Sequence, residues 1–446
     1  MENKLPKNWV NSKLDDLTVI QSGGTPPREN KDYWNGEIPW VKISDLKKWF
    51  VDSTSEFITE EGLNNSSTKI FPKGTILFTI FASIGKVGVL NIDACTNQAI
   101  AGITPVNNIE HKFLTYSLIE LSELLKSEGK GVAQKNINLS ILKNINVPLP
   151  PLKEQQRIVA KLDTLFTHLE VLNTRLATIP KLLKNFKQAV LTQAVTGKLT
   201  EEWRKGKALD EWKEVELETI ANVIDPQPSH RTPPIHEDRI PYVSIKDVNK
   251  KGKVNLKTAR PVSKEVLAQH VKRYDLQEGD FAFGKIGTLG KPFLLPIFSE
   301  RKYTLSANII LIQPRSKGNP KFLYYYLNSS IIEQKLREGT NSTSQPAFGI
   351  KKARKFPTPN PLPEEQTEIV KRVENLFAKA DKIEAQYKIL KEKTDSLPQA
   401  ILAKAFKGEL VAQLDTDGSA KDLLAEIKKL KAAVAPKKKM KKKVKV

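Results

Sequence analysis

The feature that most constrains this chain of 446 residues is a long apolar seam that occurs twice. Between residues 153 and 179, apolar side chains follow each other at alternating steps of four and three, the a/d pattern of a coiled-coil helix. Each member of the second seam lies 211 residues after its counterpart in the first. The first seam is Ile158, Leu162, Leu165, Leu169, Leu172, Leu176 and Ile179, and the second is Ile369, Val373, Leu376, Ala380, Ile383, Tyr387 and Leu390.

An apolar stripe along a helix needs a partner that covers it. Two unrelated surface helices, each packed on its own domain, would meet that need, but they would not explain the equal offset. We therefore predict that the two helices pair antiparallel within one chain and bury each other's stripe. The first helix should end or kink at Pro180, and Gly197 should cap the helical stretch that follows.

The blocks before the two helices also repeat. Both combine short runs of β-branched and aromatic residues with a helical stretch, and both end in a proline-rich segment. Between the shared landmarks the residues differ widely. The correspondences are Trp9 with Trp212, residues 38–43 (IPWVKI) with 240–245 (IPYVSI), 84–88 (IGKVG) with 286–290 (IGTLG), and 112–114 (KFL) with 321–323 (KFL).

These patterns predict an α+β fold built as a tandem, pseudo-twofold repeat. Two similar mixed domains would be joined by two long antiparallel coiled-coil helices. The predicted boundaries are 1–150 for the first globular domain, 151–200 for the first helical region, 211–360 for the second domain, 361–410 for the second helical region, and 411–446 for a short helix with a basic tail.

The chain is strongly basic, with a formal net charge of +22. Ten lysines lie between Lys428 and Lys445, but more than half of the excess remains without them. A basic body indicates a polyanionic partner, most often nucleic acid. The lysine tail could serve solubility alone, or it could attract DNA phosphates irrespective of sequence.

Several classes of protein are disfavoured. One cysteine, Cys95, permits neither an internal disulfide nor a thiolate metal cluster, and the five histidines lack metal-ligand spacing. The sequence shows no signal-peptide pattern and no run of about 18 apolar residues. We expect a cytoplasmic protein that binds no metal and no membrane.

Further duplicated motifs point to a family. The segment 148–166 (PLPPLKEQQRIVAKLDTLF) corresponds to 361–377 (PLPEEQTEIVKRVENLF), and each helical region closes on Ala-[Val/Ile]-Leu followed by Gly-x-Leu, at 189–199 and 400–410. With the two Gly-x-x-Gly turns, these motifs make the chain similar to the specificity subunit of a Type I restriction–modification system. The resemblance covers about residues 1–430.

The resemblance implies that the globular blocks are target-recognition domains joined by an antiparallel coiled coil. It implies double-stranded DNA as ligand, read as a bipartite and asymmetric site. It also implies two methyltransferase (modification) subunits and motor–nuclease (restriction) subunits as partners in host defence. S-adenosylmethionine, ATP and Mg²⁺ would then be bound by those partners, and this chain would need no cofactor.

The chain shows no sign of its own catalysis. An amino-methyltransferase needs an Asn/Asp-Pro-Pro-aromatic loop, and the nearest matches, residues 360–363 (NPLP) and 225–228 (DPQP), lack the second proline and the aromatic residue. No Gly-x-x-x-x-Gly-Lys-[Ser/Thr] phosphate loop occurs. A self-contained nuclease or methyltransferase is therefore disfavoured.

Candidate DNA contacts are side chains on loops above the predicted scaffold, where Arg or Lys suits guanine and Asn or Gln suits adenine. Each one alone is more often a solvated surface group, but together they recur at duplicated places. Gly85, Gly88, Gly287 and Gly290 would make either tight turns or a close backbone approach to DNA. The candidates are Lys42, Ser44, Lys86, Gln134, Lys135 and Asn136 in the first domain, and Ser244, Lys246, Lys285, Thr288, Ser344 and Gln345 in the second.

One alternative remains open at this level. The chain could be a coiled-coil scaffold whose globular blocks bind protein and not DNA. Salt-dependent binding to random duplex DNA would separate these two functions.

Overall fold

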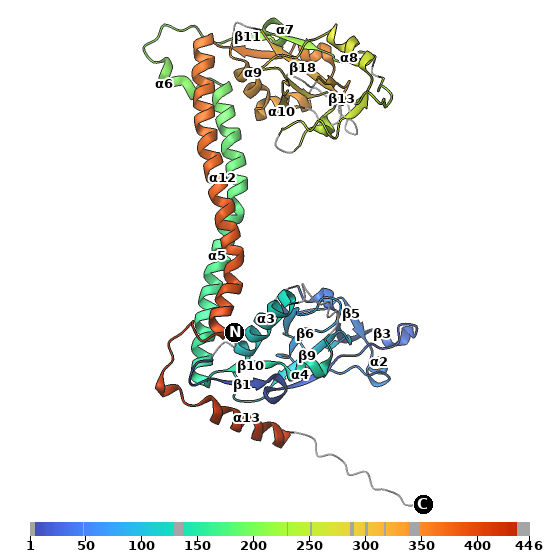
Figure 1. Cartoon of the computed structure of the whole chain (residues 1–446), viewed down its shortest axis with the longest axis vertical. Helices are drawn as coiled ribbons and strands as arrows, with labels where there is room; N and C mark the ends of the chain where they lie inside the picture. The colour runs from blue at the N-terminus through green and yellow to red at the C-terminus, as the bar shows by residue number, and fades with distance from the viewer. Residues whose placement is uncertain are drawn as a thin grey trace, which may run out of the picture. The chain divides into compact units, whose positions relative to one another are not determined.

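The computed structural model describes residues 5–47, 49–128, 137–229, 231–249, 252–285, 290–298, 302–315, 318–338 and 348–434. It divides into two compact units (Figure 1). The first unit comprises residues 1–176 and 390–446, and the second comprises residues 177–389. Each unit therefore contains one globular domain and a part of each long helix.

The first domain contains a strand pair and two sheets. The pair is β1 (Val10–Lys13) with β10 (Asn146–Leu149), which are antiparallel. The five-stranded sheet has the order β2 (Thr18–Ser22), β9 (Ile100–Pro105), β6 (Ile76–Thr79), β7 (Val87–Leu90), β4 (Phe50–Val51). The three-stranded sheet has the order β5 (Glu56–Ile58), β3 (Trp34–Val41), β8 (Cys95–Thr96). Its helices are α1 (Leu14–Leu17), α2 (Glu60–Asn64), α3 (His111–Glu128) and α4 (Leu139–Asn144).

The second domain repeats this plan strand for strand, apart from β4. The pair is β11 (Lys213–Glu216) with β19 (Pro357–Asn360). The larger sheet has the order β12 (Ala221–Ile224), β18 (Ile309–Pro314), β15 (Phe281–Gly284), β16 (Gly290–Leu294), and the smaller has the order β14 (Arg260–Val262), β13 (Ile240–Val243), β17 (Thr304–Leu305). Its helices are α7 (Leu217–Ile220), α8 (Lys264–Val271), α9 (Pro320–Leu327), α10 (Ser330–Glu338) and α11 (Ile350–Arg354).

The central strands of the larger sheet in each domain, β6 and β15, are buried on both faces, which explains their uninterrupted apolar sequence. In β6, Ile76 and Phe78 belong to a core with Leu114 and Leu118 of α3, whereas Leu77 faces a second core. In β15 the same alternation sends Phe281 and Phe283 to one core and Ala282 to another. A strand whose side chains alternate between two cores has no face left for solvent.

The two long helices are α5 (Leu152–Val195) and α12 (Pro363–Phe406), and they pair antiparallel as predicted. In the first unit, Ile158 and Leu162 near the start of α5 pack with Leu402 and Phe406 at the end of α12. In the second unit, the end of α5 packs on the start of α12 through Val190, Leu191, Ala194, Ile369, Val370 and Val373. Opposite ends of the helices thus meet in each unit.

Two details of the helix prediction need correction. The helix α5 does not end at Pro180 but continues to Val195, and Pro180 lies at an exposed position. The seam residues Ile383 and Leu390 are 49% and 44% exposed, whereas Thr394 is buried. A strict heptad assumes 3.5 residues per turn, so a helix with 3.6 drifts by about 20° per heptad. Over the two heptads from Ile369 to Ile383 and the third to Leu390, this drift turns the predicted positions toward solvent.

The helix α13 (Ala420–Val434) packs on the first domain (Figure 1). Ile427 is buried in the same core as Phe78, and Leu423 and Leu424 pack against that core. Lys428 and Lys431 form ion pairs with acidic residues of α1, namely Asp16 and Asp15. The last described helix of the chain therefore completes a core that begins near residue 14.

Among the described residues, no helix is long and apolar enough to cross a membrane. The same residues contain no group of three or more His, Cys, Asp or Glu side chains arranged to hold a metal ion.

Candidate nucleic-acid interface

Each domain carries the same short turn after its central small-sheet strand. Strand β3 leads into a 3-10 turn at residues 42–45 (turn 1), and β13 leads into its equivalent at residues 244–247 (turn 2). In turn 1, the carboxylate of Asp45 accepts the backbone N–H of Lys42 at 2.8 Å. In turn 2, the carboxylate of Asp247 accepts the backbone N–H of Ser244 at 2.8 Å and its hydroxyl at 3.0 Å. In both turns, the aspartate side chain thus caps the backbone N–H of the first residue.

A threonine from the neighbouring strand segment fixes each turn further. Thr54 Oγ1 donates to Asp45 at 3.1 Å, and Thr258 Oγ1 donates to Asp247 at 3.0 Å. These bonds hold the aspartate of each turn against the backbone, so that another residue of the turn faces solvent. Ser44 and Lys246, the third residue of each turn, are exposed.

Turn 1 lies beside a cluster of aromatic and charged side chains. The Arg28 guanidinium carbon lies 3.7 Å from the Trp34 ring centroid and 4.9 Å from that of Trp40, within the range of cation–π attraction. Glu56 forms ion pairs with Arg28 at 2.6 Å and with Lys42 at 2.5 Å. Burial raises the pKa of Glu56, but the hydrogen bonds from Lys42 and Arg28 outweigh it, so the pKa lies below its ordinary value.

Turn 2 borders an open cleft of about 520 Å³. Three exposed cations, Lys246, Lys257 and Arg260, line this cleft. Asp247 is the one carboxylate among the described lining residues, and its oxygens already accept hydrogen bonds within turn 2 and from Thr258. The described lining of the cleft therefore carries three cations against one carboxylate, a positive balance that suits a polyanion.

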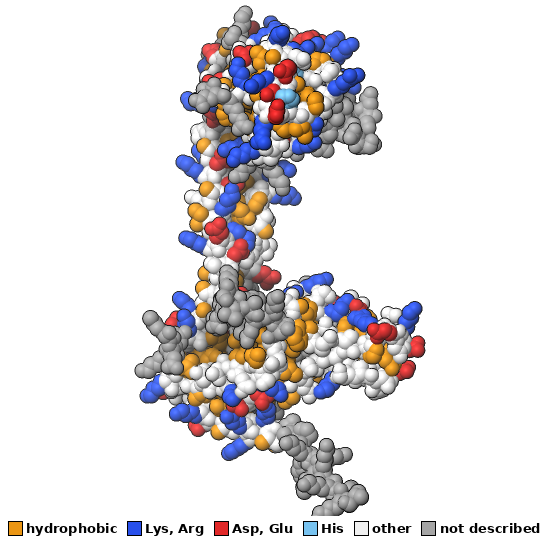
Figure 2. Space-filling model, turned by 45° about the vertical axis from the view of Figure 1, so that its right-hand side comes forward, with side chains coloured by type: hydrophobic (Ala, Val, Ile, Leu, Met, Phe, Trp, Pro, Cys, Tyr) orange, Lys and Arg blue, Asp and Glu red, His pale blue; other side chains and the backbone are white. Residues whose placement is uncertain are grey.

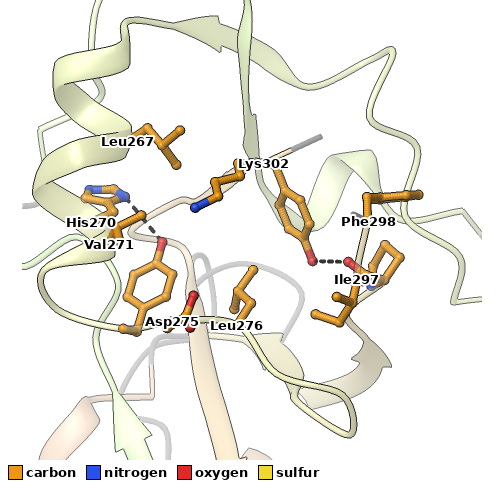
Figure 3. A pocket seen from close by; sticks show the side chains of 11 residues that line it. Leu267, His270, Val271, Asp275, Leu276, Ile297, Phe298 and Lys302 are labelled. Atoms are coloured by element: carbon orange, nitrogen blue, oxygen red, sulfur yellow. Dashed lines mark hydrogen bonds between the residues drawn. The ribbon is translucent and has the colours of Figure 1, made fainter. Parts of the chain in front are cut away.

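A buried polar cluster holds the strand behind turn 2, and Figure 3 draws His270 of this cluster. His270 of α8 is hydrogen bonded to Thr304 of β17 and to Gln227. The Tyr274 hydroxyl lies 2.9 Å from Thr304 Oγ1 and accepts the backbone N–H of Leu305 at 3.0 Å. Strand β17 pairs with β13, so this cluster supports the strand that delivers turn 2. Burial lowers the pKa of His270, which favours the neutral ring.

A small pocket of about 160 Å³ opens beside this cluster. Figure 3 shows apolar side chains of α8 and of the segment after β16 around it, with Lys302 and Asp275 at its edge. Val271, Ile297 and Phe298 at this pocket are 42%, 49% and 45% exposed. Charged side chains are few here, so the cleft at turn 2 is the better place for DNA.

The remaining candidates fall into three groups. Lys86 is exposed, and its backbone N–H donates to Thr79 Oγ1 at 2.8 Å. Lys285 is only 6% exposed, and its ammonium pairs with Asp225 at 2.8 Å, so its placement favours a structural role. Six candidates lie outside the described residues: Gln134, Lys135, Asn136, Thr288, Ser344 and Gln345.

The glycines of the first Gly-x-x-Gly turn serve packing. A Cβ at Gly85, where φ is +83°, would lie 2.3 Å from Ser122 Oγ of α3. A Cβ at Gly88 would lie 3.5 Å from Leu46 in the core. Of the two alternatives, the structure favours a tight turn packed on α3. Gly287 lies outside the described residues, and Gly290 begins β16.

Four charged residues at these turns were not predicted from the sequence: Arg28, Glu56, Lys257 and Arg260. One signal was available, because Thr-Pro-Pro occurs before both small sheets, at residues 25–27 and 232–234. That repeat aligns the loops that flank the two turns. Figure 2 shows basic side chains over both units on the face drawn, with acidic ones among them, so charge alone does not reveal this site.

Comparisons with known proteins give matches over most of the chain. The family model described as Type I restriction modification DNA specificity domain matches residues 6–181 and 209–392. The EcoBI specificity subunit of Escherichia coli is 29% identical over 98% of this chain and 95% of its own length. The EcoKI specificity subunit of Escherichia coli strain K12 is 29% identical over 99% of both chains.

Solved structures share the fold. The HsdS subunit from Thermoanaerobacter tengcongensis superposes with a TM-score of 0.60 over 91% of this chain and 98% of that chain, at 19% identity. A chain from a structural study of assembly and conformational transition in the type I R-M system superposes with a TM-score of 0.63, also at 19% identity. Both alignments cover 91% of this chain.

Proposed function

Because the chain belongs to the Type I restriction–modification DNA specificity family, we propose that it reads a bipartite, asymmetric DNA site and assembles the other subunits there. It is a specificity subunit and is itself non-catalytic. Methyl transfer and DNA cleavage would fall to two modification subunits and to motor–nuclease subunits. Those partners would bring S-adenosylmethionine, ATP and Mg²⁺.

One observation carries this proposal: the two turns share a backbone but project different side chains, Ser44 from turn 1 and Lys246 from turn 2. Turn 1 reads Lys-Ile-Ser-Asp and turn 2 reads Ser-Ile-Lys-Asp. In both, the aspartate carboxylate accepts the first residue's N–H at 2.8 Å. A shared scaffold with different projecting groups would place two different sets of donors and acceptors on two half-sites. The two half-sites should therefore differ in sequence.

The chemistry of the site suits duplex DNA. Lysine and arginine side chains neutralise phosphates and supply affinity that does not depend on sequence, whereas base edges supply selectivity. The three cations at turn 2 stand in a cleft whose described lining has one carboxylate, that of Asp247. We assign Lys42, Ser44 and Lys246 to contacts with DNA, because they stand on rigid turns at equivalent places. Ser244 is buried and its hydroxyl donates to Asp247, so its placement favours a structural role.

The long helices carry features expected of a surface that binds partners. In the second unit, Leu182, Phe186, Ile383 and Ile389 are 61%, 41%, 49% and 56% exposed. In the first unit, Val171, Leu390 and Leu397 are 46%, 44% and 39% exposed. Large apolar side chains that remain exposed on a helix pair often mark protein contacts. We propose that modification subunits cover these residues.

The test is to express the chain in a host together with its modification partner and to map modified bases across the genome. We expect one interrupted motif with two different halves, and no methylation by the purified chain alone. Binding of the chain to random duplex DNA should weaken as salt rises. A chain without salt-dependent binding to duplex DNA, and with no modified motif in the host, would instead support a protein-binding scaffold.

A further inference from the structure

The two domains carry opposite charges at one equivalent position. On β5, Glu56 pairs directly across from Trp40 of β3. On β14, Arg260 pairs directly across from Tyr242 of β13. The third strand of each small sheet also pairs at this aromatic residue: Trp40 pairs with Cys95 of β8, and Tyr242 pairs with Thr304 of β17. Glu56 and Arg260 therefore occupy one position of the repeated fold, immediately beside turns 1 and 2.

Despite this reversal, each domain has an arginine at that place. In the second domain, it is Arg260 itself, on the strand. In the first domain, Arg28 reaches the same aromatic position from the preceding loop and forms its ion pair with Glu56. The repeated Thr-Pro-Pro shows that Arg28 corresponds in sequence to Ile235, which is 67% exposed. The arginine is thus supplied by the loop in one domain and by the strand in the other.

The loop that carries Arg28 is held at both sides. The Trp40 indole N–H donates to the Gly24 carbonyl at 2.9 Å, and the Trp34 indole N–H donates to the Pro27 carbonyl at 3.1 Å. These are the two rings over which the Arg28 guanidinium lies. The Arg28 side chain is nevertheless 50% exposed. A guanidinium that is oriented in advance but still open to solvent loses less entropy when it binds.

Arg260 is oriented by a comparable contact. Its Nε donates to the Pro233 carbonyl at 2.8 Å, within the Thr-Pro-Pro segment of its own domain. The residue is exposed and lines the cleft beside turn 2 with Lys246 and Lys257. In both domains, therefore, a polar contact or an ion pair orients an exposed guanidinium at the edge of the turn.

We propose that Arg28 and Arg260 are functional counterparts, each contacting a guanine edge in the half-site read by its own domain, and that Glu56 positions Arg28. The inference rests on the proposed function and goes further by naming the residues and the base. A guanidinium matches the O6 and N7 acceptors of guanine with two parallel hydrogen bonds, the commonest specific contact in the major groove. Sequence alignment hides the pairing, because the two arginines lie on different elements.

Glu56 has a second consequence in this arrangement. It holds both Arg28 and Lys42, so it neutralises part of the positive charge that DNA phosphates would otherwise attract. Removing its charge should release both cations for phosphate contact, while Arg28 loses its fixed orientation. Glu56→Gln should therefore raise affinity for random DNA and lower selectivity at one base pair. A residue needed only for folding would lower both.

The first experiment compares methylation motifs of hosts that express the full chain with its modification partner. We expect Arg28→Ala to relax one G·C pair in one half of the motif, and Arg260→Ala to relax one G·C pair in the other half. Loss of a bidentate base contact should reduce modification of the original site roughly ten-fold to a hundred-fold. Lys69→Ala and Lys272→Ala, at exposed positions of the two domains, are the matched controls and should leave the motif unchanged.

The second experiment moves the arginine from loop to strand in the first domain. Arg28→Ile should relax the motif as Arg28→Ala does. The double variant Arg28→Ile, Glu56→Arg copies the second domain and should restore preference for guanine at that base pair. If the double variant folds, as its melting temperature would show, but does not restore the preference, the two arginines are not counterparts.

The third experiment measures binding of the full chain to random duplex over a range of salt concentrations. Glu56→Gln should bind more tightly than wild type at low salt, with a salt slope steeper by up to about two, because two cations are released. Glu56→Asp keeps the charge and should behave like wild type.

These outcomes separate the two levels of the argument. A wild-type chain that directs no bipartite methylation contradicts the proposed function. A wild-type chain with a clear motif that Arg28→Ala and Arg260→Ala leave intact contradicts this inference alone. Uniform weakening at all sequences, without loss of a base preference, would show phosphate contacts and would also overturn it.

Discussion

Arg157 on α5 and Asp417 in the segment after α12 form a two-pronged ion pair, with Nη1–Oδ1 and Nη2–Oδ2 distances of 2.5 and 2.6 Å. The Asp417 side chain is only 2% exposed. In the second unit, Arg204 after α5 pairs with Glu365 at the start of α12, where Glu365 also accepts from Thr200 and Trp212. Each unit thus ties the segment that follows one long helix to the start of the other helix.

The first prediction concerns this tie. Arg157→Met leaves the buried Asp417 carboxylate without its guanidinium, which should lower the free energy of unfolding of the first unit by about 3 kcal/mol. Denaturant unfolding, monitored in the first unit, would measure the change. Lys161→Met, at an exposed position on the same helix, is the control and should be close to neutral.

The same pair predicts a dependence on acid. The hydrogen bond from Arg157 lowers the pKa of Asp417 in the folded protein. The stability that it contributes should be complete above the ordinary aspartate pKa of about 3.9, and should be lost as pH falls through the lower, folded value. Asp417→Asn should therefore flatten the pH dependence of unfolding at its acid end. If Asp417→Asn leaves the pH dependence of unfolding in acid unchanged, Asp417 is not the group responsible for it.

The second prediction concerns His270. Burial lowers its pKa, so the unfolded chain takes up a proton at higher pH than the folded protein does. Stability of the second unit should be complete above about pH 6.5 and should decrease as pH falls toward the folded value. Thermal unfolding of His270→Gln should depend less on pH in this range than that of wild type. His168→Gln, at an exposed position on α5, should keep the wild-type dependence.

The third prediction tests the register of the helix pair. Leu162 is fully buried, so Leu162→Ala should cost about 2–5 kcal/mol of unfolding free energy. Ile383, although a member of the predicted heptad seam, is 49% exposed, so Ile383→Ala should change stability by less than about 0.5 kcal/mol. Chemical denaturation of both variants would decide the matter. A large loss of unfolding free energy in Ile383→Ala would instead support the strict heptad assignment of the seam.

The fourth prediction concerns the lysine-rich end of the sequence. Truncation after residue 434 removes seven lysines and no acidic residue. Binding to all duplex sequences should weaken alike, and the salt dependence should become shallower, while the methylated motif stays the same. Binding titrations at several salt concentrations would measure the first two effects. A changed motif would mean that the tail contributes to selectivity.

The repeat and the helix pair could be predicted because their signal lies in local spacing. Apolar steps of three and four and the constant offset need no tertiary information. Ile383 and Leu390 were assigned wrongly because small deviations from 3.5 residues per turn accumulate along a helix. The turns at residues 42–45 and 244–247 were also recognisable, since each follows a duplicated strand.

The charged neighbours of these turns were beyond sequence reasoning. Arg28 and Arg260 become comparable only through strand pairing with Trp40 and Tyr242, and no spacing rule aligns a loop residue with a strand residue. Lys285 was taken for a surface lysine because its partner, Asp225, lies 60 residues earlier in the chain. Burial and pairing over such separations depend on the assembled fold.

The discontinuous first unit has a consequence for biosynthesis. Its core includes Ile427, and its helix pair needs Leu402 and Phe406, so its last parts emerge from the ribosome near the end of translation. The second unit is one continuous segment, residues 177–389, and is available in full before then. The domain synthesised first is therefore expected to finish folding last, and its nascent N-terminal half is the part of this protein that chaperones and proteases encounter longest.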